Sequence, residues 1–374
     1  MGRSVGDMGE QKARRTAAPV GWRVGRSSLP LRKEAPSGIA WAMIRSAAPV
    51  PPLAGGPFPA DADEPGQPTG WVLAHCSDPH LARPELLRPR DFLSKRLFGW
   101  LRWQLKRRRE QDEGLLTTLA DDLQRMRPDH LAVTGDLTHL GLAGEGAVAG
   151  AWLQTLGPAE RVTVVPGNHD RYLAGDWRET LACWLPWLQG DGSQADEPLP
   201  AELSALFPTL RLRPPVALIG CSTAEPTAPH LASGTLGAAQ LARLATLLER
   251  LAGQGWCRVL LIHHPPVTNA VSWRRGLTDA PALQALIARH GVELVLFGHT
   301  HRTISATLPG PHGPVPVLGA PSITARRGPE GRRSRYFLYT VRRTARGWAI
   351  GQRERRLDAE ENGFVDGVRR EFAL

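Results

Sequence analysis

The feature that most constrains this 374-residue chain is a repeated alternation of short apolar runs with polar motifs. Each of these motifs ends or follows an apolar run that is typical of a β-strand covered on both faces. The five motifs are Ser77-Asp78-Pro79-His80, Thr134-Gly135-Asp136, Gly167-Asn168-His169-Asp170, Ile262-His263-His264-Pro265 and Gly298-His299-Thr300-His301. They place carboxylates, imidazoles and one amide at the ends of strands.

The apolar runs predict strands at 71–76, 130–134, 161–165, 216–221, 258–262 and 292–297. Between them, Leu residues recur at helical spacing, which predicts helices around 115–126, 236–251 and 283–287. Strands that alternate with helices indicate an α/β fold. Further strands, with no helix between them, are predicted at 304–308, 315–318, 336–341 and 348–350. We therefore expect a second, more antiparallel sheet after His301.

The first 69 residues differ from the rest in being rich in Pro and Gly, with no apolar period. We expect 1–69 to be a disordered extension, or a mis-assigned start with Met43 as the later start, and 70–374 to form a single domain. No apolar run approaches the roughly 20 residues of a transmembrane helix. The N-terminus lacks a signal-peptide pattern, and we expect a cytoplasmic protein.

The charge of the chain restricts the kinds of partner that we expect, and its cysteine content restricts the expected cellular compartment. Lys and Arg number 46 against 36 Asp and Glu, a net charge of +10 that favours anionic partners. Phosphorylated small molecules, nucleic acid and an anionic membrane surface all meet that criterion. The chain has no CxxC pair, and three of its four cysteines lie in apolar runs, where buried free thiols are expected. A reducing cytoplasm fits this pattern.

The five motifs suit a divalent metal site, because α/β sheets gather ligands in the loops at the carboxyl ends of their strands. The two oxygens of Asp136 can bridge two ions, and Asn168 supplies a neutral amide oxygen. Two cations roughly 3.5–4 Å apart can hold a hydroxide and neutralise phosphoryl oxygens. Nitrogen and oxygen ligands without thiolate suit Mn, Fe, Zn or Co. We expect two divalent metal ions of this kind.

The order DxH, GD, GNHD, HxP and GHTH resembles the calcineurin-like metallophosphoesterase superfamily over residues 71–305. The resemblance implies an α/β fold, a four-layer α/β/β/α sandwich with two mixed sheets flanked by helices. It implies that one metal is held by Asp78, His80, Asp136 and His301, and the other by Asp136, Asn168, His263 and His299. It also implies catalytic roles for His169, which stabilises the phosphate or protonates the leaving group, and for Asp170, which orients His169. In the HxP block it selects His263 over His264.

The activity implied is that of a dinuclear metal-dependent phosphohydrolase, in which a metal-bridging hydroxide attacks a small phosphoester, most often a phosphodiester. The block spacing resembles bacterial members similar to class III cyclic-nucleotide phosphodiesterases. The alternatives are a nuclease or a sugar-nucleotide pyrophosphatase of the same superfamily, and a non-catalytic scaffold with the same fold. The pyrophosphatase branch usually has GNRD where this chain has Gly167-Asn168-His169-Asp170.

Two basic segments stand outside the motifs. Residues 95–109 combine seven Lys and Arg with interleaved Phe, Trp and Leu. The segment predicts a helix that covers the rim of the site, or one that contacts an anionic membrane or nucleic acid. Arg274 and Arg275 follow the HHPP block, and either side chain is a candidate for binding a substrate phosphate, since guanidinium offers bidentate donors.

Overall fold

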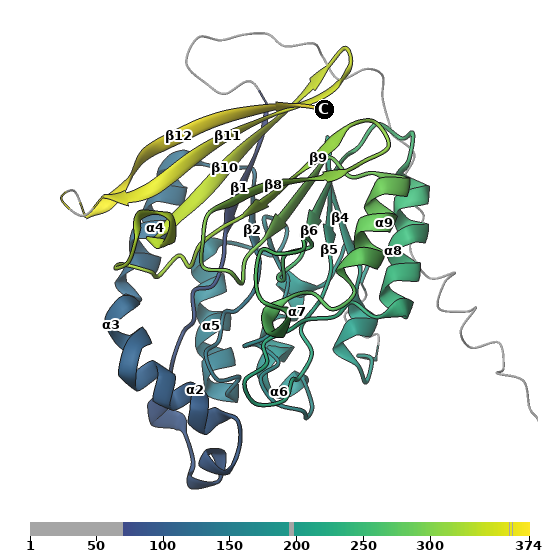
Figure 1. The fold of residues 1–374 in the computed structure, drawn as a ribbon. Helices are drawn as coiled ribbons and strands as arrows, with labels where there is room; N and C mark the ends of the chain where they lie inside the picture. The colour runs from purple at the N-terminus through teal and green to yellow at the C-terminus, as the bar shows by residue number, and fades with distance from the viewer. Residues whose placement is uncertain (1–69, 194–197, 359, 361) are drawn as a thin grey trace, which may run out of the picture. The chain divides into compact units, whose positions relative to one another are not determined.

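The computed structural model describes residues 70–193, 198–358, 360 and 362–374, so the predictions for 1–69 lie outside the described residues. Two six-stranded mixed sheets form the centre of the fold (Figure 1), with the orders β12-β11-β10-β1-β2-β3 and β4-β5-β6-β7-β9-β8. The strands are β1 (Trp71–Cys76), β2 (His130–Val133), β3 (Val162–Val164), β4 (Thr209–Arg213), β5 (Val216–Gly220), β6 (Cys257–Leu261), β7 (Leu294–Phe297), β8 (Ile304–Pro309), β9 (Pro314–Gly319), β10 (Arg335–Thr344), β11 (Gly347–Asp358) and β12 (Gly363–Ala373).

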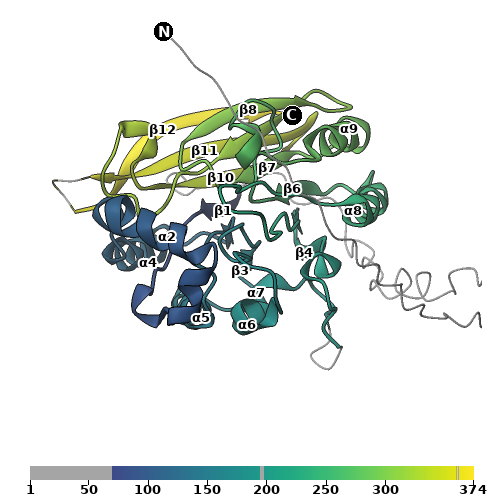
Figure 2. The same ribbon diagram turned by 60° about the horizontal axis from the view of Figure 1, so that its bottom comes forward.

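Helices cover the outer face of each sheet (Figures 1 and 2), which confirms the predicted four-layer α/β/β/α sandwich. On the first sheet α4 packs against β12 and α7 against β3, while α8 and α9 lie together on the second, with α9 against β8. The α-helices are α2 (Arg96–Arg102), α3 (Arg108–Glu110), α4 (Gly114–Met126), α5 (Ala143–Leu156), α6 (Arg178–Leu181), α7 (Leu185–Leu188), α8 (Ala238–Leu251) and α9 (Ala280–His290), and a π-helix spans Trp103–Arg107.

The space between the sheets is filled by one apolar core. Leu73 and Val133 of the first sheet and Val259 and Leu296 of the second belong to the same buried cluster. Each of these side chains is fully buried, because sheet and helices cover both faces of its strand. This burial explains why the strands are continuous apolar runs in the sequence. The shared core also keeps the two sheets packed together near the edge where the polar loops emerge.

Parallel pairing brings those loops together. β1, β2 and β3 run parallel in the first sheet, and β5, β6, β7 and β9 run parallel in the second. The carboxyl ends of parallel strands meet at the same edge of a sheet, where open α/β sheets bind ligands. The five motifs follow β1, β2, β3, β6 and β7 at this edge.

The prediction that the strands after His301 form a second, more antiparallel sheet is wrong. β8 and β9 extend the second sheet, whereas β10, β11 and β12 extend the first. β10 pairs antiparallel with β1, with Trp71 opposite Val341 and His75 opposite Phe337. The open edge of β1 therefore takes up the C-terminal strands, which satisfies its backbone groups and removes an unpaired edge from the middle of the fold.

The described residues also test two smaller expectations. Cys76, Cys221 and Cys257 are buried free thiols, as predicted, whereas Cys183 is exposed. Across the described part of the chain, no helix has the length and apolar character that crossing a bilayer requires.

Candidate metal centre

The loops of both sheets converge on one polar centre. Six of the predicted metal ligands form two compact groups, Asp78 with His80 and His301, and Asp136 with His263 and His299. In each group the candidate ligand atoms all lie within 4.8 Å of one another. The first sheet supplies Asp78, His80 and Asp136, and the second sheet supplies the other imidazoles, so neither sheet alone completes either group.

The first group is arranged around facing nitrogens and a carboxylate oxygen. Nε2 of His80 and Nε2 of His301 lie 2.9 Å apart. Oδ1 of Asp78 lies 3.1 Å from the His301 nitrogen and 3.7 Å from the His80 nitrogen. Three donor atoms at these separations converge on a single point, which is the arrangement that one cation requires.

Asp136 lies between the two groups. Its Oδ2 atom is 3.3 Å from Nε2 of His263 and 3.8 Å from Nε2 of His80. Its other oxygen accepts a hydrogen bond of 2.8 Å from the backbone N–H of His169, which fixes the orientation of the carboxylate. The same carboxylate thus reaches both ligand groups, as a bridging ligand must.

The donor atoms fit a metal because several of them are buried without a partner. Oδ1 of Asp78, Oδ1 of Asn168, Nε2 of His263 and Nε2 of His299 have no hydrogen-bond partner among the described residues. Burying a polar group without a hydrogen bond costs roughly 1–3 kcal/mol, so four such atoms in one place require another partner. Mixed nitrogen and oxygen donors are what Mn, Fe, Zn and Co accept.

Backbone strain is concentrated at the same residues. Nine described non-glycine residues have a positive φ, and five of them are predicted ligands: Asp78 (55°), His80 (47°), Asp136 (54°), His299 (63°) and His301 (52°). Side chains with a Cβ rarely adopt this left-handed conformation, which persists where the surrounding structure enforces it. The concentration of strain at one centre indicates that ligand placement determines these loop conformations.

Two glycines allow the loops to approach so closely. A Cβ at Gly298 would clash with Ser77 and lie 2.5 Å from Oδ2 of Asp78. A Cβ at Gly167 would clash with Oδ1 of Asp136. A side chain at either position would displace a carboxylate of the centre, so both motifs need glycine at these positions.

The choice between His263 and His264 is decided by hydrogen bonds. His264 has both ring nitrogens occupied, with Nδ1 2.7 Å from Oγ1 of Thr223 and Nε2 3.1 Å from the Ala232 carbonyl. His263 donates Nδ1–H to the Thr134 carbonyl at 2.6 Å, which leaves Nε2 directed at Asp136. This geometry supports His263 as the ligand, since ligating imidazoles donate their other N–H to a second partner.

The side chains of His169 and Asp170 bind different backbone groups, and the roles that the resemblance implies for them stay predictions. Nδ1 of His169 donates to the carbonyl of His139 at 2.5 Å, and this carbonyl orients the ring. The Asp170 carboxylate instead accepts from the backbone N–H groups of Thr138 and Gly167 at 2.8 and 2.9 Å. Asp170 therefore fixes the backbone of the loop, because buried backbone N–H groups need an acceptor.

His139 is a site residue that sequence reasoning missed. His80, His139 and His169 form a third group of donors within 4.8 Å of one another. The His139 and His169 rings stack, with centroids 5.4 Å apart. The available signal was its position three residues after Asp136 in the same loop.

Burial and neighbouring charges shift the pKa values of the candidate ligands. Burial would lower the pKa of His263, but the Asp136 carboxylate outweighs burial and raises that pKa to about 9. Burial would raise the pKa of Asp78, but His301 outweighs burial and lowers it to about 2. Burial also holds the pKa of His299 well below its usual value, so this imidazole is neutral. Without metal, His263 therefore carries the proton that a cation must displace.

We expect the affinity for Mn²⁺ to depend on pH through His263. An imidazole ligand must be neutral, so below the His263 pKa of about 9 the affinity should rise by about tenfold per pH unit, and it should level off above that value. Asp78 is ionised throughout this range and adds no slope. Competition with a chelator from about pH 6.5 to about pH 9.5 measures the effect, since this range includes the His263 pKa. A His263→Gln variant should show a shallower slope, and a flat wild-type profile would contradict this assignment.

The basic segment 95–109 covers the centre. It forms α2, the π-helix and α3, and the π-helical turn carries Arg107 to the site. Nη1 of Arg107 lies 3.4 Å from Nδ1 of His80 and 3.2 Å from Nδ1 of His139. Sequence analysis did not single out this arginine, because the irregular helix changes which face each side chain takes.

The outer face of this segment exposes Phe98, Leu101 and Leu105. The exposed fraction of Leu105 reaches 76%, which is unusual for a large apolar side chain. The predicted contact with an anionic membrane stays a prediction. No feature of the described residues favours nucleic acid over other anions.

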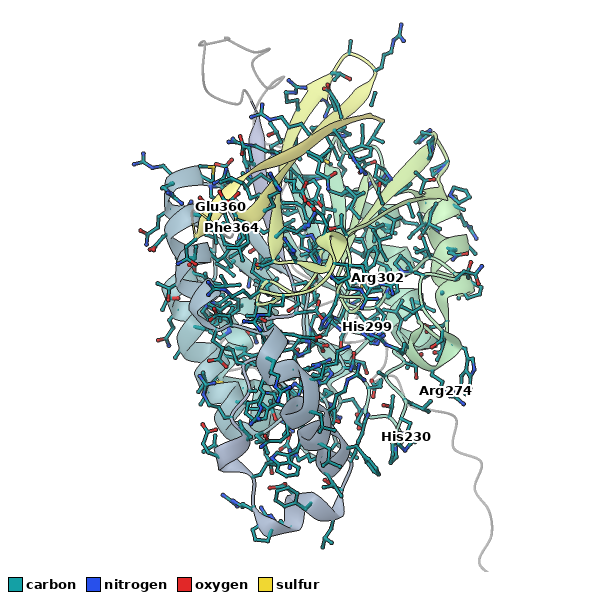
Figure 3. The ribbon with its side chains drawn as sticks, turned by 60° about the vertical axis from the view of Figure 1, so that its left-hand side comes forward. His230, Arg274, His299, Arg302, Glu360 and Phe364 are labelled. Atoms are coloured by element: carbon teal, nitrogen blue, oxygen red, sulfur yellow. The ribbon has the colours of Figure 1, made fainter. Side chains whose placement is uncertain are left out.

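A cavity of about 620 Å³ lies beside the centre, with Thr300, His301 and Arg107 in its wall. Arg275 also lines this cavity, and its guanidinium donates to the carbonyl of His299 at 3.2 Å. Arg274 instead lies over the Trp273 ring, 5.1 Å from its centroid. In the view of Figure 3, Arg274 lies nearer the outer edge of the molecule than His299. Of the two candidate arginines, Arg275 is therefore the one positioned beside the centre.

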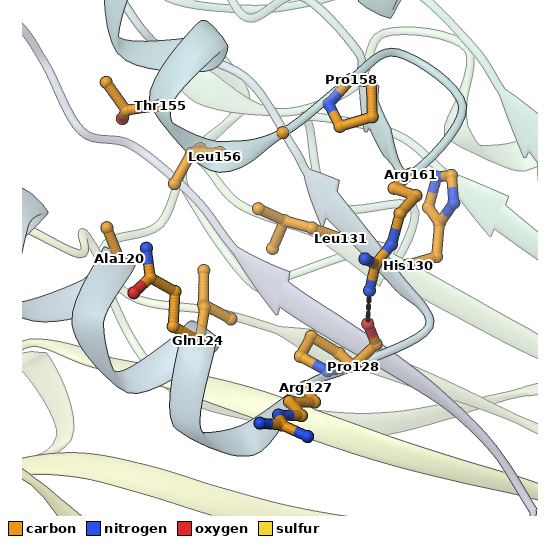
Figure 4. Close-up of a pocket in the computed structure, with 12 residues that line it drawn as sticks. Ala120, Gln124, Arg127, Pro128, His130, Leu131, Thr155, Leu156, Pro158 and Arg161 are labelled. Atoms are coloured by element: carbon orange, nitrogen blue, oxygen red, sulfur yellow. Dashed lines mark hydrogen bonds between the residues drawn. The ribbon is translucent and has the colours of Figure 1, made fainter.

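A second cavity, of about 380 Å³, lies near the amino end of β2 (Figure 4). Its wall contains His130, Gln124 and Arg161, and Arg161 donates to the Pro128 carbonyl at 2.7 Å. The predicted site residues lie at the carboxyl ends of the strands and take no part in this wall. This cavity is separate from the candidate metal centre.

Comparison with known proteins agrees with this geometry. The sequence model of the calcineurin-like phosphoesterase family matches residues 72–303, which is more than half of the chain. The chain therefore belongs to the calcineurin-like phosphoesterase family, as the five motifs predict. A search of curated protein sequences finds no match.

Several solved structures resemble the fold at low sequence identity. A dimetal phosphatase from Danio rerio is 12% identical, with 79% of this chain and 98% of that chain covered and a TM-score of 0.49. A purple acid phosphatase from yellow lupin is 14% identical, with 83% and 54% covered and a TM-score of 0.47. A sulfate thiohydrolase from Thermus thermophilus is 18% identical, with 82% and 59% covered and a TM-score of 0.46.

Proposed function

We propose that this chain is a dinuclear metal-dependent phosphohydrolase that acts on a phosphodiester. The observation that carries the proposal is the position of Asp136, whose Oδ2 reaches His80 of one ligand group and His263 of the other. One cation would be held by Asp78, His80, Asp136 and His301, and the other by Asp136, Asn168, His263 and His299. When bound, two such cations activate a water molecule and neutralise phosphoryl oxygens.

The chain's own residues supply positioning and proton transfer. Because Nδ1 of His169 donates to the His139 carbonyl, the ring is held in one tautomer and Nε2 remains for the substrate. The Tyr172 ring stacks on His169, with centroids 5.4 Å apart, and limits its rotation. When Nε2 also carries a proton, His169 is placed to give it to the leaving oxygen and so return to the neutral form that burial favours, while Asp170 keeps the loop beneath it in place.

A diester is favoured over a monoester by the space beside the centre. A monoester places only one alcohol on phosphorus, whereas a diester needs room for two substituents. The cavity of about 620 Å³ next to His301 provides that room. Its size lies within the range of small-molecule sites, which is roughly 300–1,000 Å³.

The test uses protein that has been stripped of metal and reloaded with Mn²⁺. We expect bis(p-nitrophenyl) phosphate to be hydrolysed with a higher kcat/KM than p-nitrophenyl phosphate. A preference for the monoester would move the proposal to phosphatases. No turnover with Mn, Fe, Zn or Co, although metal is bound, would favour the non-catalytic scaffold.

Replacement of His169 by Ala is expected to lower kcat on the diester by roughly 10²–10⁴-fold, which is the usual contribution of a positioned general acid. His312→Ala is the matched control, because His312 is exposed in the turn between β8 and β9. The metal content should be unchanged in both variants. Unchanged diester hydrolysis by His169→Ala would remove His169 from the proposed mechanism.

The remaining alternatives stay predictions. A nuclease and a sugar-nucleotide pyrophosphatase would use the same metal ligands, and assays with single-stranded DNA and with UDP-sugars distinguish them from a small-diester hydrolase. The predicted cytoplasmic location and the resemblance to class III cyclic-nucleotide phosphodiesterases also await direct tests.

A further inference from the structure

The cavity beside the metal centre has a wall of unusually high positive charge. Seven of its lining residues are cationic, and one, Glu110, is anionic. The cationic residues come from four separate segments of the chain, the basic helical segment, the loop after β6, the loop before β8 and the loop after β9. They are Arg102, Lys106, Arg107, Arg275, Arg302, Arg327 and Arg332.

Most of these cations have no described carboxylate within ion-pair distance. Lys106 lies 3.7 Å from Glu110, an ion pair formed within its own helical segment. Among the described residues, no ion pair involves any of the six arginines of the cavity. Guanidinium groups gathered in a concave wall raise the local positive potential, which attracts multiply charged anions.

Several arginines outside the cavity do have a carboxylate partner. Arg326, the neighbour of Arg327, pairs with Asp112 at 2.5 Å. Arg353 pairs with Asp366 at 2.7 Å on the outer sheet. Carboxylates thus neutralise several surface arginines, whereas the described wall of the cavity contains one carboxylate, Glu110, for seven cationic residues. A cavity wall with seven cationic residues and one carboxylate is suited to a ligand that carries several negative charges.

We propose that this cavity binds a second phosphoryl group of the substrate, so that the substrate is a small phosphodiester carrying at least one further phosphate. This inference rests on the proposed function, which places the scissile phosphoester at the metal centre. The cavity volume of about 620 Å³ favours a small molecule over a nucleic-acid strand. Arginine suits the role, because its fork binds phosphate oxygens in a bidentate manner.

The arginines divide into an inner and an outer set. Arg107 contacts His80, and Arg275 contacts the backbone of His299, so these two lie at the metal centre. Arg327 and Arg332 lie on the loop between β9 and β10, away from the ligand residues in sequence. The inner pair is placed to contact the scissile phosphoryl group, and the outer pair is placed to bind the additional phosphate.

The test compares two ligands that differ by one phosphate, thymidine 3′,5′-bisphosphate and thymidine 5′-phosphate. Calorimetric titration of the Mn²⁺-loaded protein measures binding, since neither ligand contains the diester that the enzyme is proposed to cleave. We expect the bisphosphate to bind at least about tenfold more tightly, because it gains a charge-assisted contact in the cavity. The double variant Arg327→Gln/Arg332→Gln should lose that advantage and keep the affinity for the monophosphate.

Arg326→Gln is the control, since it removes one arginine charge from the same loop at a residue outside the cavity wall. It should keep the preference for the bisphosphate. Equal wild-type affinity for the two ligands, or equal losses in the control and in the double variant, would overturn the inference.

Hydrolysis separates this inference from the proposed function. Thymidine 5′-(p-nitrophenyl phosphate) and its 3′-phosphorylated form present the same scissile diester to the Mn²⁺-loaded enzyme. A preference for the 3′-phosphorylated form that the double variant abolishes supports both proposals. Turnover of both compounds at one rate overturns only the second-phosphate site. Tight binding of the bisphosphate with no turnover of either compound overturns only the proposed function.

Discussion

Replacement of Asp136 by Asn is expected to lower kcat/KM for bis(p-nitrophenyl) phosphate by about a thousandfold, or ~4 kcal/mol in transition-state stabilisation. Asn keeps the size of the side chain and an acceptor for the His169 backbone N–H, which Oδ1 of Asp136 now binds at 2.8 Å. It removes the negative charge and places a neutral amide between two cations. Steady-state kinetics at saturating Mn²⁺ measures the loss.

Metal content should fall with activity in this variant. Because Oδ2 of Asp136 faces both ligand groups, the change is expected to weaken both sites rather than one. Asp121→Asn is the control, since Asp121 is exposed on α4 and the substitution has the same chemistry. Wild-type activity in Asp136→Asn would remove this residue from the bridging position.

Replacement of Asp122 by Ala is expected to lower the free energy of unfolding by about 3–5 kcal/mol, the usual effect of breaking a buried ion pair. Asp122 is buried on α4 and binds Arg355 of β11 through two hydrogen bonds of 2.7 and 2.9 Å. The Tyr336 hydroxyl donates to the same carboxylate at 2.5 Å. The variant leaves the buried Tyr336 phenol without its acceptor and removes one of the two carboxylates that bind the Arg355 guanidinium, the other being Asp366. Chemical denaturation measures the change.

The control for this prediction is Asp121→Ala, one position earlier on the exposed face of the same helix. It should change stability by no more than about 0.5 kcal/mol, as is usual for a surface site. A change of similar size in the two variants would mean that the Asp122 network does not anchor α4 to the first sheet.

Much of the fold could be predicted from sequence because its central strands are covered on both faces. Continuous apolar runs located β1, β2, β5 and β6 to within one or two residues. The edge strand β12 was not predicted, because its charged residues face solvent and give no apolar run. Helix α5 was missed for a different reason. Its Gly146 and Gly150 pack against Thr180 and Cys183, so close packing of small residues replaces a leucine stripe.

The order of the strands within the sheets could not be predicted from the sequence. The sequence indicates that strands without helices follow His301, but a strand pattern does not say which sheet receives it. β10 reaches back to β1, across more than 250 positions, because that edge offers unpaired backbone groups. Such a long-range pairing leaves no local signal in either strand.

The candidate site was more predictable than the strand order, because its residues follow strands whose ends must meet. The two ligand groups contain Asp78, His80, Asp136, His263, His299 and His301, all of which the motifs had singled out. Arg107 and the His139 carbonyl were missed. Arg107 reaches the site through an irregular π-helix, and His139 acts through its backbone, which carries no side-chain signature.

The most direct test of the account is a titration of stripped protein with Mn²⁺, in which bound metal and hydrolysis of bis(p-nitrophenyl) phosphate are measured on the same samples. The account predicts that activity rises until two ions are bound per chain, since the structure provides two ligand groups joined by Asp136. Full activity in stripped protein, or no hydrolysis when two ions are bound, would contradict it.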